Sequence, residues 1–244
     1  PFLSQFLDEK LHIIPPPVEL PDYSTADVAA FRAKHNLGDE PVIGIICRLA
    51  AEKGVEVLLK ALPIVREKFP NVRVLHAGQY ANIIGEEAYA ARLAPLFEKY
   101  KDHYHLLGNI EGPELSAFYN CLDVLCVPSL NSTESFGLVQ IEAMQNGVPV
   151  AACALPGVRQ PVTMTGMGEV TAVGDHNALA QAIIKILGNK EAYQRDRELI
   201  GATFSPDETA NAYVQLFEKL QRGRLVGKTT EPAAYDRLRA MRDE

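Results

Sequence analysis

The sequence has no tryptophan, only four cysteines and no surplus of positive charge. A formal net charge of −7 argues against a general nucleic-acid-binding protein, because neutralising phosphates needs clustered Lys and Arg. No apolar run reaches the ~20 residues of a membrane-spanning helix, and the N-terminus lacks the basic start and apolar core of a signal peptide. The cysteines lie in apolar stretches without metal-ligand spacing: Cys47, Cys121, Cys126 and Cys153. Reduced core cysteines of this kind favour a cytoplasmic protein.

Histidines offer only weak evidence for a metal site. His103 and His105 are two positions apart beside a strand-like run, so they would share a face and could bind a metal. Since no third ligand stands nearby, a solvated strand end is the favoured interpretation. We therefore predict no metal site.

From residue 41 onward, short apolar runs alternate with amphipathic segments. The runs predict strands at 41–49, 71–78, 104–108, 123–129, 148–153 and 168–173. Between and after them, helices are expected at 54–69, 85–100, 112–120, 137–146, 175–187, 190–200 and 205–221. This order predicts an α/β fold: a Rossmann-like parallel sheet with helices on both faces, and with ligands at the carboxyl ends of the strands.

The two ends of the chain differ from this pattern. The opening stretch reads as a short helix, an apolar run and then Pro15, Pro16 and Pro17, which are typical of a stiff hinge. We expect residues 1–18 to be the remnant of a preceding domain with its hinge, and residues 19–222 to be the domain that contains the sheet. Residues 223–244 are polar and are expected to form a loose tail with one exposed helix.

The stretch "ESFGLVQIE" places Glu134 and Glu142 on either side of a predicted helix start. Free backbone amides of Phe136, Gly137 and Leu138 would face the ligand crevice, and Gly137 would let a phosphate approach closely. Glu142 lies about one turn deeper than Leu138, roughly 5 Å along the axis, where a nucleotide's ribose would follow its diphosphate. Glu134 would reach the group beyond the phosphates.

Cations for such a diphosphate are available in "CRLAAEKG". Arg48 and Lys53 follow the first predicted strand and should reach the same edge of the sheet. Two glutamates alone would favour an ordinary solvated helix surface. Their pairing with this Arg/Lys loop favours a nucleotide site instead.

"RLAAEKGVEVLLKA" and "ESFGLVQIEAMQNGVPVAA" closely resemble the donor-binding, C-terminal half of retaining GT-B glycosyltransferases of family GT4. The second stretch matches that family's E-x7-E signature, and the resemblance extends over about residues 12–220. It implies that residues 19–222 form a nucleotide-sugar-binding domain. It implies that Arg48 and Lys53 hold the donor diphosphate, that Glu142 binds the ribose and that Glu134 contacts sugar hydroxyls near the reacting carbon. It also implies contacts to the donor from the segment Ser135–Leu138 and from Gly157.

The implied reaction transfers a sugar from a UDP-, GDP- or ADP-linked donor to an acceptor hydroxyl, with retention of the anomeric configuration. In the family's usual account the leaving phosphate deprotonates the acceptor, so no cofactor or metal is required beyond the donor co-substrate. The acceptor-binding N-terminal domain is expected to be missing from this chain, which would then be inactive alone. Any membrane association would be carried by that domain.

The chain departs from the family pattern in two places. "IIPPPVEL" stands where an Asn-Gly hinge is usual, and "LPGVRQPV" puts Gln160 near a position that is usually acidic. Donor-sugar contacts between Gly157 and Gln160 are therefore left open. Two alternatives also stay open: a sugar-phosphate or disaccharide synthase with the same donor half, and a non-catalytic nucleotide- or partner-binding module with this fold. Arg48, Lys53, Glu134 and Glu142 are all present, which favours an enzyme over the last alternative.

Overall fold

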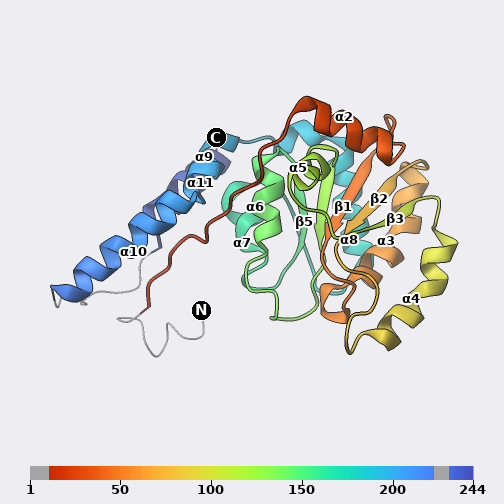
Figure 1. The fold of residues 1–244 in the computed structure, drawn as a ribbon, viewed down its shortest axis with the longest axis horizontal. Coiled ribbons are helices and arrows are strands. Elements are labelled where there is room, and N and C mark those ends of the chain that lie inside the picture. Colours follow the sequence, from red (N-terminus) through yellow and green to blue (C-terminus); the bar gives the residue numbers. More distant parts are fainter. Residues whose placement is uncertain (1–10, 223–230, 244) are drawn as a thin grey trace.

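A six-stranded, fully parallel sheet forms the centre of the protein in a computed structural model, which describes residues 11–222 and 231–243 (Figure 1). The strand order is β3-β2-β1-β4-β5-β6. Its members are β1 (Val42–Ile46), β2 (Arg73–Ala77), β3 (Tyr104–Gly108), β4 (Val124–Val127), β5 (Val150–Cys153) and β6 (Gly168–Thr171). All six predicted strands and the predicted Rossmann-like fold class are thus confirmed.

Helices cover both faces of this sheet. The first face is packed by α3 (Val55–Lys68), α4 (Glu87–Lys99) and α8 (His176–Gly188). The second carries α2 (Thr25–Lys34), α5 (Pro113–Asn120), α6 (Leu138–Gln145), α7 (Gln160–Thr165), α9 (Arg197–Thr203) and α11 (Ala233–Asp243). Successive strand residues alternate between the two cores, as Val124 and Cys126 against Leu125 and Val127. The four inner strands, β2, β1, β4 and β5, are buried on both faces, and they therefore read as continuous apolar runs.

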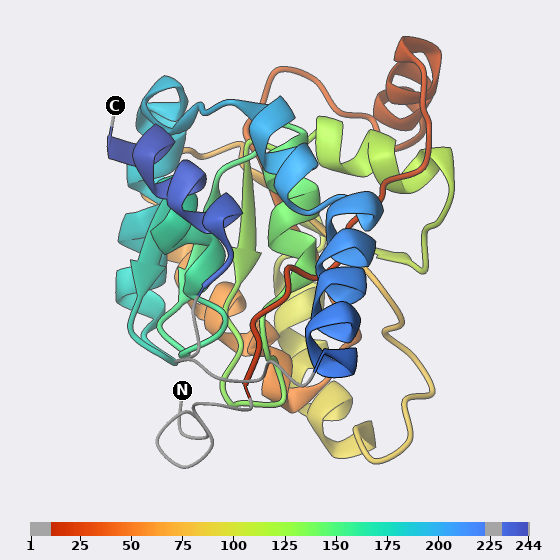
Figure 2. The ribbon, with the colours of Figure 1, turned by 90° about the vertical axis from the view of Figure 1, so that its left-hand side faces the viewer.

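Helix α10 (Pro206–Gln221) extends away from the sheet (Figures 1 and 2). It starts at Ser205, whose hydroxyl accepts from the amide of Glu208, with Pro206 in the first turn as predicted. Beside it runs the extended segment 11–24. Val18 donates its amide to the carbonyl of Phe204 at 2.7 Å, and Thr209 donates its hydroxyl to the carbonyl of Pro15 at 2.8 Å. The proline-rich segment is therefore held against the helices of the C-terminal part.

Several helix predictions need correction. The helix expected over 190–200 is split into a 3-10 turn, η3 (Lys190–Tyr193), and α9, because Asp196 caps a new helix through the amides of Glu198 and Leu199. Helices α2 and α7 were not predicted at all. The helix of the tail exists as α11, but the prediction that it is exposed is wrong, because Ala234, Tyr235 and Leu238 are buried. The helix expected at the start of the chain lies outside the described residues.

Candidate nucleotide-sugar site

The strand order reverses direction between β1 and β4, which is where ligands bind in open α/β sheets. A hollow of about 580 Å³ lies at this point. Its walls come from the carboxyl ends of β1, β2 and β4, from the start of α6 and from Asn109 after β3. Five residues predicted from the sequence line it together: Arg48, Lys53, Glu134, Gly137 and Leu138.

The loop after β1 is closely packed against the loop after β4. A 3-10 turn, η2 (Ala51–Lys53), ends at Gly54, whose φ of 68° is left-handed. A Cβ added at Gly54 would lie 2.0 Å from the carbonyl oxygen of Pro128, so only glycine allows this approach. The amide of Leu130 donates to the carbonyl of Glu52 at 2.8 Å. These contacts place Lys53 opposite Glu134, the first predicted glutamate.

Lys53 and Glu134 form an ion pair inside the hollow. Their Nζ and Oε2 atoms are 2.6 Å apart, and the side chains are only 22% and 21% exposed. The two residues are separated by 81 positions in the chain, so the fold and not local sequence brings them together. A partly buried cation beside a carboxylate can exchange that partner for a phosphate, while the carboxylate turns to hydroxyl donors.

Arg48 lies at the rim. Its guanidinium donates to Glu52 at 2.6 Å and is 55% exposed, so reaching a diphosphate would require it to exchange Glu52 for phosphate oxygens. At this degree of exposure an ion pair contributes little, and the exchange would cost little free energy.

The start of α6 supplies backbone donors. Gly137 is the N-cap, with a φ of 78°, and Leu138 is the first helical residue. Amides of a first helical turn have no partner within the helix and carry the positive end of its dipole, so they can bind an anion. The ring of Phe136 packs on Phe204, with centroids 5.9 Å apart, which leaves only its backbone for a ligand. Ser135, Phe136, Glu142 and Gly157 flank the hollow and are not among its lining residues.

Glu142 lies one turn into α6 and is bonded to a buried tyrosine. Its Oε2 accepts a hydrogen bond from the hydroxyl of Tyr119 on α5. Burial raises the pKa of the Glu142 carboxyl above its ordinary value, and the Tyr119 bond acts in the opposite direction. The hydrogen bond from Tyr119 therefore fixes the position of the carboxylate, although burial disfavours its charged form.

Two residues in the loops after β2 and β3, Gln79 and Asn109, also line the hollow, and Tyr119 holds Glu142. None of the three was singled out from the sequence as a site residue, and Tyr119 belongs to no recognisable motif. Cys47 lines the hollow as well, but burial raises the pKa of its thiol to about 12, so the thiol stays protonated and unreactive near neutral pH.

The family model for glycosyl transferases group 1 matches residues 27–199, most of the chain. The chain belongs to the glycosyl transferases group 1 family. The prediction of a GT4-type glycosyltransferase is thereby confirmed.

Relatives and solved structures agree with this assignment. Phosphatidyl-myo-inositol mannosyltransferase of Mycobacterium leprae is 35% identical over 143 residues, which is 59% of this chain and 36% of that protein. D-inositol 3-phosphate glycosyltransferase of Mycobacteroides abscessus is 30% identical over 210 residues, 85% of this chain and 46% of that protein. Sucrose-phosphate synthase of Thermosynechococcus elongatus is similar in structure, with a TM-score of 0.72 and 30% identity over 91% of this chain and 56% of that one. The chain thus spans between about a third and just over half of the length of these three proteins.

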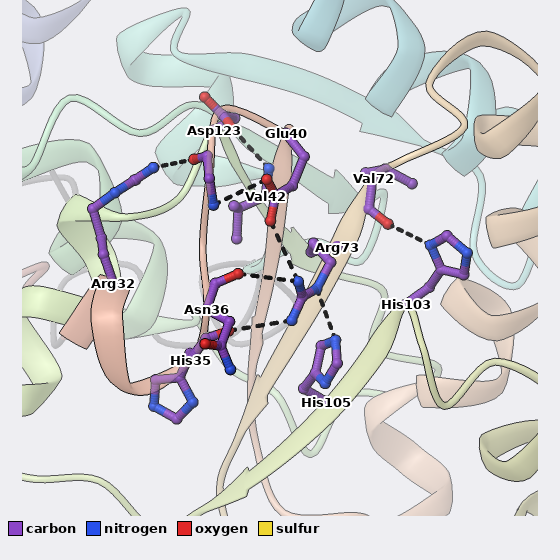
Figure 3. A network of polar contacts seen from close by, with 11 residues as sticks. Arg32, His35, Asn36, Glu40, Val42, Val72, Arg73, His103, His105 and Asp123 are labelled. Atoms are coloured by element: carbon purple, nitrogen blue, oxygen red, sulfur yellow. Dashed lines mark hydrogen bonds and ion pairs between the residues drawn. The ribbon is translucent and has the colours of Figure 1, made fainter.

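The histidine pair does not form a metal centre in this family member. His103 is bonded to the carbonyl of Val72 at 3.0 Å, whereas the Nε2 of His105 accepts from the Nε of Arg73 at 2.8 Å (Figure 3). Arg73 also reaches Glu40 and the carbonyls of His35 and Asn36, so the cluster ties β2 and β3 to the end of α2. Both histidines are half-buried and take part in hydrogen bonds, so the solvated strand end favoured from the sequence is not what the structure has. Across residues 11–222 and 231–243, no group of three or more metal-ligating side chains is found.

No helix within the described part of the chain is both long and apolar enough to cross a bilayer.

Proposed function

We propose that residues 19–222 bind a nucleoside-diphosphate sugar as the donor of a retaining glycosyltransferase. The observation that carries this proposal is the Lys53–Glu134 pair inside a hollow at the topological switch point. The lysine at this place can bind the anionic diphosphate of such a donor, and the carboxylate opposite it can accept hydrogen bonds from the hydroxyls of the sugar.

Each part of the donor has a complementary group. Lys53, Arg48 and the first-turn amides of α6 would hold the diphosphate. Glu142, one turn deeper, would accept hydrogen bonds from the ribose hydroxyls. Glu134 would orient the sugar, and Ser135 and Gly157 would border it. The base would then lie toward Gln79 and Asn109, which follow β2 and β3.

The proposed reaction breaks the bond between the anomeric carbon and the β-phosphate oxygen, and forms one from that carbon to an acceptor oxygen on the same face. The departing phosphate takes the acceptor proton. Lys53 and Arg48 would stabilise the negative charge that grows on the diphosphate, which is the usual electrostatic role of such groups. Because the cations supply this charge, we propose that the donor binds without a divalent metal.

The donor base and sugar define the first experiment. Titration calorimetry of the chain should compare UDP with UDP-glucose, GDP with GDP-mannose and ADP with ADP-glucose. GDP-mannose belongs in the panel because one relative is named as a GDP-mannose-dependent mannosyltransferase, and UDP-glucose because the HepE structure of Anabaena, similar at a TM-score of 0.67 and 22% identity, contains it.

We expect one base to bind clearly more tightly than the others. Replacing Lys53 by Met should weaken that binding, whereas Lys185→Met, which breaks a Lys–Glu pair of similar length with Glu169, should not. No binding by any probe would overturn the proposed function. Binding without sugar transfer in a version of the protein extended to the full length of its relatives would favour the non-catalytic alternative.

A further inference from the structure

Gln140 connects the two loops that border the proposed sugar position. It lies in the first turn of α6 and is completely buried. Its amide nitrogen donates to the carbonyl of Phe136 at 2.9 Å and to the carbonyl of Val158 at 2.8 Å. One acceptor is in the loop before α6 and the other is in the loop after β5, so a single amide joins both.

The two loops are in backbone contact at this place. A Cβ added at Gly157 would lie 1.6 Å from the carbonyl oxygen of Ser135, a distance that no side chain tolerates. A Cβ added at Gly137 would lie 2.8 Å from the nitrogen of Gln140 itself. The loop after β5 therefore needs glycine at position 157 to come this close to Ser135, and Gln140 joins the two loops at that separation.

The orientation of the amide follows from chemistry. Only the NH₂ group of glutamine can donate, and both neighbours are carbonyl acceptors, so the nitrogen must face them. The other end, Oε1, is buried and has no hydrogen-bond partner among the described residues. A buried acceptor without a partner lowers stability, and an apolar side chain of similar length would avoid that cost. The amide thus serves the two carbonyls and not the packing of the core.

We infer that Gln140 is a positioning residue for the donor sugar. It keeps the segment 134–137 and the segment 157–158 at a fixed distance, so that Glu134 and Gly157 border the same bound sugar. This inference rests on the proposed function. The proposed diphosphate contacts, at Lys53 and Arg48, and the proposed nucleoside contacts, at Glu142 and after β2 and β3, lie outside these two loops, so they should not depend on the separation of the loops.

The test replaces Gln140 by Met, which keeps the length of the side chain and removes both donors. In the ligand-free protein, hydrogen–deuterium exchange should become faster in residues 131–138 and 154–160 together, with strands β1 and β4 unchanged. For ligands, we expect affinity for the sugar nucleotide to fall about 3- to 10-fold, while affinity for the matching free diphosphate changes less than about twofold. The probes are UDP with UDP-glucose and GDP with GDP-mannose.

Gln145→Met is the matched control, because Gln145 ends the same helix away from both loops. It should change neither exchange nor affinity. Unchanged exchange in Gln140→Met, or equal losses for free diphosphate and sugar nucleotide, would overturn the inference. If that variant does not fold, Gln140→Leu is used in its place, and failure of both to fold would assign Gln140 to stability alone. If the wild type binds no probe, the proposed function fails, and the exchange experiment still shows whether Gln140 joins the loops.

Discussion

The Lys53–Glu134 pair makes a prediction in which one substitution acts in opposite directions on two ligands. Replacing Glu134 by Gln removes the anion that competes with a diphosphate for Lys53. The pair is partly exposed, so its net contribution is about 0.2–1 kcal/mol. Free nucleoside diphosphate should therefore bind about 1.4- to 5-fold more tightly. The sugar nucleotide should bind more weakly, because its hydroxyls lose a charged acceptor.

Replacing Lys53 by Met should weaken both ligands. Loss of a charge-assisted contact to phosphate corresponds to about 1.5–3 kcal/mol, or about 10- to 150-fold in Kd. If Lys53 served only to neutralise Glu134, its replacement would have no further effect once Glu134 is Gln. The account instead predicts that most of the loss remains in the double variant.

The assay is titration calorimetry of wild type, both single variants and the double variant, at fixed salt and pH. Lys185→Met and Glu169→Gln, made separately and together, provide the same cycle at a Lys–Glu pair on α8 and β6. Weaker binding of free diphosphate by Glu134→Gln would refute the reasoning. So would a double variant that binds as tightly as Glu134→Gln alone.

Three further predictions concern Glu142 and the metal. Glu142→Gln should weaken nucleotide binding by about 1.5–3 kcal/mol, as measured by calorimetry. The same variant should raise the melting temperature at neutral pH, because burial disfavours the charged carboxyl in the folded state. Unchanged affinity would show that Glu142 does not bind the ribose. Nucleotide affinity should fall with decreasing pH as Glu142, whose pKa is raised, becomes protonated, and Tyr119→Phe should move this decline to higher pH because it removes the hydrogen bond that favours the carboxylate. Binding curves from pH 4 to 8 measure the shift, with Glu142→Gln as the pH-insensitive reference. Identical curves for Tyr119→Phe and wild type would contradict this prediction. Finally, excess EDTA should leave donor binding unchanged. If EDTA abolishes binding and Mg²⁺ or Mn²⁺ restores it, a metal ion balances the charge on the diphosphate and this prediction is wrong.

The centre of the sheet was predictable because its four inner strands, β2, β1, β4 and β5, are buried on both faces and read as apolar runs. Starts of helices were predictable where a cap is local, as at Asp175, whose carboxylate accepts from the amides of Asn177 and Ala178. The break at Asp196 was not, because a helical pattern continues across it. Helix α7 was missed, and α11 was wrongly expected to be exposed, because α7 packs on α11 and β6 while α11 packs on α7 and α9. No short window of sequence contains these contacts.

The candidate site divides in the same way. Motif spacing identified Arg48, Lys53, Glu134, Gly137 and Leu138, which line one hollow. It could not show that Lys53 and Glu134 pair in the absence of ligand, since that contact spans 81 positions. Supporting contacts such as Tyr119 to Glu142, or Gln140 to two loops, depend on which elements are neighbours. Those residues carry no signature of their own, so only the three-dimensional structure reveals them.

Titration of the chain with sugar nucleotides in EDTA tests the central claim most directly. We expect one of UDP-glucose, GDP-mannose and ADP-glucose to bind to the wild type at a single site. Lys53→Met should weaken this binding about 10- to 150-fold, whereas Lys185→Met should not. Absence of binding for all three, or equal affinity in wild type and Lys53→Met, would contradict the claim that the hollow between β1 and β4 is a donor site.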